Sequence, residues 1–85
     1  MNYKDFPKYD PRRTLVVLFA IERLGPEAST HYLAQDLSCT RSEVQRAIEN
    51  AQKTYLMEFK KSGSIYSILS WGLVNRDAAA SKLST

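Results

Sequence analysis

The sequence predicts a mainly helical α+β fold in which three helices are followed by a two-stranded β-hairpin. Apolar residues recur at helical spacing in three successive segments between residues 11 and 53. The spacing then changes to an alternation of apolar and polar residues between residues 55 and 71. The turn sequence Lys61-Ser62-Gly63-Ser64 divides this alternating stretch into two strands. Together these three observations indicate helix, helix, helix, hairpin.

Length and composition are those of a small globular domain. The chain has 85 residues, enough for one domain with a small core. Its 12 Lys and Arg against 9 Asp and Glu give a net charge of +3, a mild basic bias that suits a polyanionic partner without requiring one. The single cysteine excludes an internal disulfide and suits a reducing compartment. No apolar run approaches the roughly 20 residues that cross a bilayer, and no signal-peptide pattern is present, so we expect a cytoplasmic protein.

The first predicted helix runs from Pro11 to about Leu24. Asp10 can cap its N-terminus through the side-chain carboxylate, and proline is favoured at the first helical position. Gly25-Pro26 ends it, because glycine suits the position after a helix and proline cannot continue one. We expect one domain at residues 11–74, preceded by an aromatic and basic arm at residues 1–10.

This first helix is apolar on nearly all sides, which a helix in so small a domain rarely is. Leu15, Val16 and Phe19 lie opposite the stripe that faces the core. This second face needs a cover, which the aromatic arm, the C-terminal tail at residues 75–85 or a second subunit can supply. The tail itself can be a short helix or a frayed end. We expect a homodimer that uses this face of the helix together with the arm.

Two further helices follow, separated by a three-residue break. The second spans Thr30–Leu37 and begins after Ser29, a good capping residue. The third runs from Arg41 to about residue 53; Thr40 caps it, and the glutamate three positions on completes a capping box. Two short helices joined by a tight turn, the second with a polar outer face, form the helix-turn-helix pattern.

The alternating stretch predicts strands at Tyr55–Lys60 and Ile65–Trp71. If Ser62-Gly63 is a two-residue loop, the register sorts apolar from polar side chains across the two faces. The opposed pairs are then Phe59 with Tyr66, Met57 with Ile68 and Glu58 with Ser67. Gly72 ends the hairpin.

Three helices followed by a hairpin is the order of a winged helix-turn-helix domain. The segment from Thr30 to Tyr66, less than half of the chain, resembles the N-terminal DNA-binding domain of the biotin-repressor type. That domain has a leucine-rich second helix, a recognition helix that begins with Ser or Thr and Arg, and a wing with a glycine before a tyrosine. The matching positions are Leu33, Ala34, Leu37, Thr40, Arg41, Val44, Ile48, Gly63 and Tyr66. The resemblance does not extend to the ligase and ligand-binding part of that family, so it implies nothing about biotin or an effector.

The third helix carries the candidate DNA-reading residues. An α-helix fits the major groove, where Arg46 can make a bidentate contact with guanine and Gln45 with adenine. Arg41 and Lys53 suit phosphate oxygens, as do backbone amides at the start of the second helix and lysines at the tip of the wing. The full set of predicted DNA-binding residues is Ser29, Thr30, Thr40, Arg41, Ser42, Gln45, Arg46, Glu49, Lys53, Lys60, Lys61, Ser62 and Ser64.

Each of these features has a structural explanation as well. Polar residues opposite an apolar stripe are found on any amphipathic surface helix. Lysines at a hairpin edge also prevent strand-to-strand aggregation. The basic residues of the arm can lie along phosphates or simply offset Asp5 and Asp10. The helix-turn-helix context favours the nucleic-acid interpretation.

No pattern in the sequence indicates an enzyme. There is no nucleophile–base pair, no glycine-rich phosphate loop and no pair of carboxylates. His31 has no second histidine near it, and we interpret Cys39 as a packing residue, so we expect no metal and no cofactor. We therefore expect a sequence-specific transcriptional regulator that binds double-stranded DNA and acts as a repressor by occupying operator DNA. The alternative is a winged helix that binds another protein instead of DNA.

Overall fold

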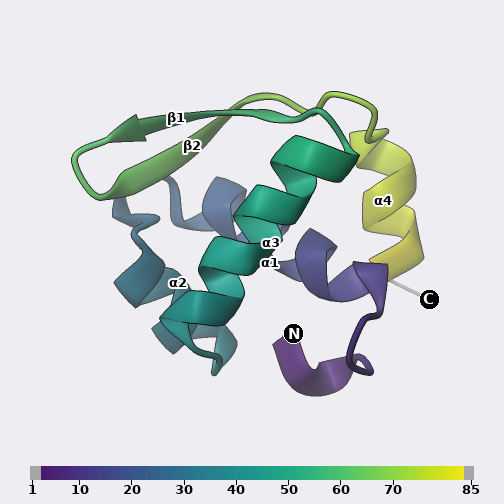
Figure 1. Ribbon diagram of the computed structural model, residues 1–85, viewed down its shortest axis with the longest axis horizontal. Coiled ribbons are helices and arrows are strands. Elements are labelled where there is room, and N and C mark those ends of the chain that lie inside the picture. The colour runs from purple at the N-terminus through teal and green to yellow at the C-terminus, as the bar shows by residue number, and fades with distance from the viewer. Residues whose placement is uncertain (1–2, 84–85) are drawn as a thin grey trace.

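The computed structural model describes residues 3–83 and confirms the mainly helical α+β fold (Figure 1). In chain order the elements are η1 (Tyr3–Asp5), α1 (Pro11–Leu24), η2 (Gly25–Glu27), α2 (Thr30–Leu37), α3 (Arg41–Thr54), β1 (Glu58–Ser62), β2 (Ile65–Ser70) and α4 (Arg76–Leu83), where η denotes a 3-10 helix. The strands form an antiparallel hairpin after the first three α-helices, a layout consistent with a winged helix. Residues 1–2 of the predicted arm and 84–85 of the predicted tail lie outside the described residues.

The predicted helix starts are confirmed by their caps. Asp10 and Ser29 each accept a hydrogen bond from a backbone N–H in the first turn of the helix that follows. At α3 the capping box is complete: Thr40 Oγ1 accepts from the Glu43 N–H at 3.1 Å, and the Thr40 N–H donates to Glu43 Oε1 at 2.9 Å. These bonds satisfy backbone groups that a helix end otherwise leaves unpaired.

The core lies where α1 crosses α2 and α3 beneath the hairpin. α1 contributes the fully buried Val17 and Leu18, and β2 contributes Tyr66, which is 6% exposed. On α3, Ala47 and Ala51 are buried, and such small side chains allow α1 to approach closely. The outer face of α3 is therefore left for solvent.

None of the helices within residues 3–83 has the length and apolar character needed to span a membrane.

The predicted hairpin register is wrong. Ser62 pairs with Ile65, so the two-residue loop is Gly63-Ser64 rather than Ser62-Gly63. The observed partners are Phe59 with Ile68, Lys60 with Ser67 and Lys61 with Tyr66. Gly63 has a φ of +62° and stands first in the loop, the position at which a type II′ turn requires glycine. Turn geometry thus outweighs the apolar pairing from which the first register was predicted.

The first strand also starts three residues later than predicted, at Glu58. Leu56 has a left-handed φ of +54°, which breaks the extended conformation, and the Met57 N–H donates to the Ala51 carbonyl at the end of α3 at 3.2 Å. Gly72 packs against this segment so closely that a Cβ there would lie 2.3 Å from the Tyr55 carbonyl oxygen. The segment after α3 is therefore a tight bend held by the loop that follows β2.

The second apolar face of α1 is covered by the same chain. Val16 is only 5% exposed and belongs to the core. Leu15 and Phe19 are half-buried, and the Phe19 ring lies 5.3 Å from the Trp71 ring, centroid to centroid. The Arg76 guanidinium, at the start of α4, lies over the Phe19 ring, 5.6 Å from its centroid. Of the covers that the sequence suggested for this face, the C-terminal segment is therefore one.

Candidate nucleic-acid interface

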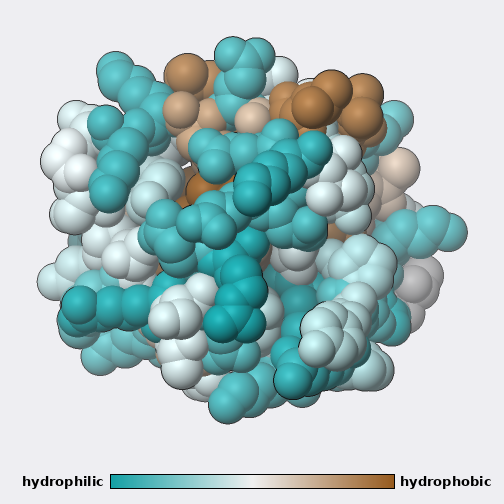
Figure 2. Space-filling model, in the orientation of Figure 1, coloured by the Kyte–Doolittle hydropathy of each residue, from teal (hydrophilic) through white to brown (hydrophobic). Residues whose placement is uncertain are grey.

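The outer face of α3 is open to solvent along its length. The exposed residues of α3 are Arg41, Ser42, Gln45, Arg46, Glu49, Asn50, Gln52, Lys53 and Thr54. Figure 2, which views the molecule with α3 in front, shows a hydrophilic surface over this helix, whereas apolar residues gather along the upper edge, near the hairpin. No other segment among residues 3–83 buries the predicted reading residues.

Ion pairing distinguishes the basic side chains of α3 and the hairpin from three arginines elsewhere in the domain. Three arginines away from this face are paired with carboxylates: Arg12 with Asp10, Arg23 with Asp36 and Arg76 with Glu22. Among the described residues, no carboxylate lies within ion-pair distance of the basic side chains of α3 and the hairpin. These basic side chains are Arg41, Arg46, Lys53, Lys60 and Lys61. Five basic side chains that form no ion pair within residues 3–83 thus lie on α3 and the hairpin, beside the acidic side chains of Glu49 and Glu58.

The hairpin is tied to α3 through Tyr66. Gln45 Nε2 donates to Tyr66 Oη at 3.4 Å, a long hydrogen bond, and the Lys61 ammonium lies 5.3 Å from the centroid of the Tyr66 ring. Tyr66 is also anchored to the body of the domain, because its N–H donates to the Ala28 carbonyl at 2.9 Å. One buried side chain therefore fixes the wing beside the helix. We call the exposed residues of α3 and the hairpin, taken together, the α3–wing surface.

Arg41 lies at the junction of α2 and α3, and its partner is a histidine. Arg41 Nη2 is 2.9 Å from His31 Nδ1, which accepts this hydrogen bond when the imidazole is neutral. Both side chains are exposed, and the contact orients the guanidinium without neutralising it. Arg41 therefore keeps a full positive charge in the first turn of α3.

The start of α2 has fewer free hydrogen-bonding groups for a phosphate than the sequence predicted. Ser29 is 7% exposed; its Oγ accepts from the Tyr32 N–H at 3.1 Å, and its own N–H donates to the Glu27 carbonyl at 2.9 Å. Ser29 thus holds α2 in place and has no group directed at a ligand. Thr40 is exposed, but its hydroxyl and N–H are both used in the capping box. Thr30 is half-buried.

A groove of about 520 Å³ runs along the opposite flank of α3 from the wing. The arm and the start of α1 form one wall, with Tyr3, Lys8, Tyr9 and Arg13; α3 forms the other, with Glu43, Arg46, Asn50 and Thr54. A hydrogen bond of 3.3 Å from Asn50 Nδ2 to Thr14 Oγ1 joins the two walls. Sequence reasoning missed this groove, because the arm has no periodic pattern that places it against α3.

The basic and amide side chains of the α3–wing surface suit polar contacts with a polyanion.

Comparisons with protein-family models, with curated proteins and with solved structures give no match. Within residues 3–83, no three histidine, cysteine, aspartate or glutamate side chains gather as metal ligands. Burial raises the pKa of the Cys39 thiol to about 11, so this thiol stays protonated at neutral pH and acts as a packing group.

Proposed function

We propose that this protein is a sequence-specific regulator that binds double-stranded DNA, with α3 in the major groove and the hairpin on the phosphate backbone. One observation carries the proposal: within residues 3–83, basic residues on the α3–wing surface have no carboxylate within ion-pair distance, whereas three arginines elsewhere do. An ion-paired cation must give up its partner before it binds a phosphate, and an unpaired one does not. Binding to the phosphates then releases counterions from the duplex, which favours association.

The roles of the side chains follow from their chemistry. Arg46 and Gln45, on the first two turns of α3, are proposed to read guanine and adenine edges. Glu49 is an acceptor that suits the exocyclic amine of cytosine. Arg41 and Lys53 flank these readers, and we assign them to phosphates, which set the register of the protein on the duplex. Ser42, near the start of the helix, suits a base or a phosphate.

The tip of the wing is proposed to contact the backbone. Its polar residues are Lys60, Lys61, Ser62 and Ser64, and all of them are exposed. The resemblance of the segment Thr30–Tyr66 to the DNA-binding part of the biotin-repressor type supports the same orientation. A small regulator of this layout acts by occupying operator DNA, so we propose repression, in the cytoplasm, as the outcome.

We also propose that the protein acts as a homodimer, because one short recognition helix reads few base pairs and two half-sites a helical turn apart add specificity. Since Val16 is buried and Phe19 is covered, the surface first expected for the second subunit is largely used within the chain. The strongly exposed apolar side chains that remain near the base of the hairpin are Leu56, Leu69 and Leu73. Sedimentation at micromolar concentration, on the unchanged protein and on Leu73→Ser, tests both the dimer and its surface.

The experiment that tests DNA binding is selection from a random duplex library, followed by affinity measurements at rising salt. We expect an enriched motif, and a log–log salt slope of about −0.9 for each phosphate contacted. Binding that does not depend on salt, or no binding to any duplex, would contradict the proposal. The enriched motif also gives the symmetry and the half-site spacing, and these report on the dimer.

A second candidate function is favoured by the same exposed leucines. Leu56, Leu69 and Leu73 are 59%, 64% and 70% exposed, and such side chains in one region are typical of protein-binding surfaces. In this alternative the winged helix binds another protein and no DNA. Absence of duplex affinity, together with a one-to-one complex that Leu73→Ser abolishes, would favour it over DNA binding.

A further inference from the structure

We propose that the groove between the N-terminal arm and α3 holds a phosphodiester strand of the duplex, on the side of the recognition helix opposite the wing. This inference rests on the proposed function and extends it, because it adds Lys8, Tyr9 and Arg13 to the DNA-binding surface. In this arrangement the wing contacts one sugar–phosphate strand and the arm contacts the other, with α3 between them.

The position of the groove is what a strand beside α3 requires. Glu43, Asn50 and Thr54 line it, so it follows the helix over 12 residues, whose first and last Cα atoms are about 16 Å apart at the rise of an α-helix. An α-helix with side chains is about 10–12 Å wide and the major groove about 12 Å, so a helix that enters it has a sugar–phosphate strand along each flank. The wing, tied to Gln45, lies on one flank and the groove lies on the other.

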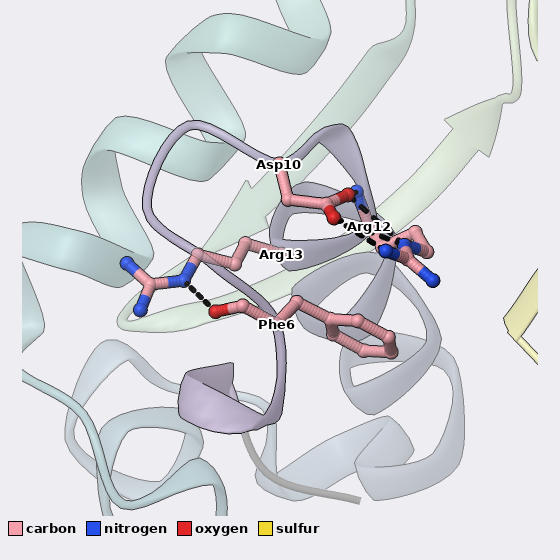
Figure 3. Close-up of polar contacts among 4 residues, drawn as sticks. All are labelled: Phe6, Asp10, Arg12 and Arg13. Atoms are coloured by element: carbon pink, nitrogen blue, oxygen red, sulfur yellow. Dashed lines mark hydrogen bonds and ion pairs between the residues drawn. The ribbon is translucent and has the colours of Figure 1, made fainter.

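The charge in the groove suits a phosphodiester. Lys8, Arg13 and Arg46 line it, and none of them forms an ion pair with a carboxylate of residues 3–83. Two acidic groups also line the groove: the charge of Asp10 is balanced by an ion pair, whereas Glu43 keeps its negative charge, so the three basic side chains outnumber it. Asp10 is bound by the Arg12 guanidinium, as Figure 3 shows, and Glu43 accepts from the Thr40 N–H in the capping box.

The arm is held against the domain in a defined conformation. Arg13 Nε donates to the Phe6 carbonyl at 2.9 Å (Figure 3), and the Arg13 guanidinium lies 4.8 Å from the centroid of the Tyr3 ring. The Asp10 N–H donates to the Pro7 carbonyl at 3.0 Å, which closes the turn before α1. These contacts fix Lys8 and Tyr9 at the rim of the groove before any ligand binds.

Tyr9 gives an independent reason to expect a ligand at this rim. Its backbone is in the left-handed region, with a φ of +70°, and its side chain is 90% exposed. A tyrosine in this conformation is strained, and contacts within the described chain leave most of its ring in solvent. A phenol there can donate to a phosphate oxygen and pack its ring against a deoxyribose.

An open groove fits a polymer better than a small molecule. Small-ligand sites bury about 70–90% of the ligand. Here Lys8, Tyr9, Arg46 and Thr54 are all exposed, so the groove is open along its length and is continuous with the outer face of α3 through Arg46. A strand can run along it and leave at both ends.

The test compares Lys8→Gln and Tyr9→Gly with the unchanged protein on the selected duplex. Lys8→Gln should make the log–log salt slope less steep by about 0.9 and leave the base preference unchanged. Tyr9→Gly relieves the backbone strain, so the fold is kept, and it should weaken binding by about threefold or more. Lys82→Gln removes the same charge from α4, away from the groove, and should leave the slope unchanged.

A neutral methylphosphonate placed at successive positions of the duplex locates the strand. At the phosphate beside Lys8, the methylphosphonate should lower the affinity of the unchanged protein for the duplex. The unchanged protein and Lys8→Gln should then bind this duplex equally well. If both arm variants bind like the unchanged protein, the groove proposal is wrong and the proposed function stands. If the unchanged protein binds no duplex, both are wrong.

Discussion

Gln45 on α3 and Tyr66 on β2 are joined by a hydrogen bond of 3.4 Å from Nε2 to the phenolic oxygen. The two residues are 21 positions apart in the chain, one exposed and one buried. The bond links a proposed base-reading side chain to the strand that carries the wing. The orientation of the Gln45 amide, and hence which base it prefers, therefore depends on the hairpin.

Tyr66→Phe removes this link and keeps the buried ring. We expect the free energy of unfolding to change by no more than about 1 kcal/mol, because one long hydrogen bond is lost. The base preference at the position read by Gln45 should relax, because the amide loses its acceptor. Selection on Tyr66→Phe, Gln45→Ala and the double variant checks this. If only Gln45→Ala alters the preference, the phenol does not position the amide.

Arg46→Ala and Lys53→Ala separate base reading from phosphate binding. Arg46→Ala should cost about 1–3 kcal/mol in discrimination at one base pair, because a bidentate contact with a base edge is lost. Lys53→Ala should weaken binding equally on all sequences and make the salt slope less steep by about 0.9. Both changes are at exposed positions, so stability should be kept. An unchanged preference in Arg46→Ala removes that residue from the reading set.

Features set by neighbours within four residues could be predicted from the sequence. Asp10, Ser29 and the Thr40–Glu43 box begin their helices as expected, because a cap depends on the side chain and the first turn alone. The exposure of the outer face of α3 follows from the period of its apolar stripe. These features provide the helical half of the α3–wing surface.

Features set by tertiary contacts could not be predicted. The hairpin register depends on the Gly63-Ser64 turn and on a bulge between Glu58 and Phe59, neither of which apolar alternation reveals. The Gln45–Tyr66 bond and the groove beside α3 both join segments distant in sequence. Burial of Ser29, likewise, is decided by the η2 turn before it and by Ile65, which bridges to it. Local patterns carry no information on such contacts.

Two ion pairs, Arg23–Asp36 and Arg76–Glu22, should make the free energy of unfolding depend on pH. Hydrogen bonding to Arg23 is the largest cause of the lowered pKa of Asp36, and Arg76 lowers the pKa of Glu22 in the same way. A carboxylate with a lowered folded-state pKa stabilises the fold above its unfolded pKa, and this stabilisation is lost as the pH falls through the folded value. The urea concentration at the midpoint of unfolding should therefore decrease when the pH is lowered below about 4.

The control for that prediction is Asp36→Asn, which removes one of these carboxylates. It should be slightly less stable than the unchanged protein at pH 7, since exposed pairs contribute little. Its midpoint should also fall less on acidification, because one titrating group is gone. Urea unfolding at pH 7, 5 and 3 measures both effects. An identical acid-induced fall in the two proteins would show that the Arg23–Asp36 pair does not contribute.

Gly72 and Gly63 form a matched pair for testing the bend at the base of the hairpin. Both have positive φ, +55° and +62°, so alanine at either position incurs the left-handed penalty of about 1–2 kcal/mol. At Gly63 an added Cβ meets nothing within 4 Å, whereas at Gly72 it would lie 2.3 Å from the Tyr55 carbonyl oxygen and 2.4 Å from that of Leu56. These are backbone atoms, which cannot move aside as a flexible side chain does.

We therefore expect Gly63→Ala to lower the free energy of unfolding by about 1–2 kcal/mol and Gly72→Ala by about 3 kcal/mol or more. Denaturant unfolding of the two variants measures the difference, which isolates the steric contribution because the conformational penalty is shared. Gly72→Ala should also increase amide exchange at Leu73, whose N–H donates to the Tyr55 carbonyl at 2.7 Å. Equal losses of stability would mean that the loop after β2 does not press on the backbone of Tyr55 and Leu56 after α3.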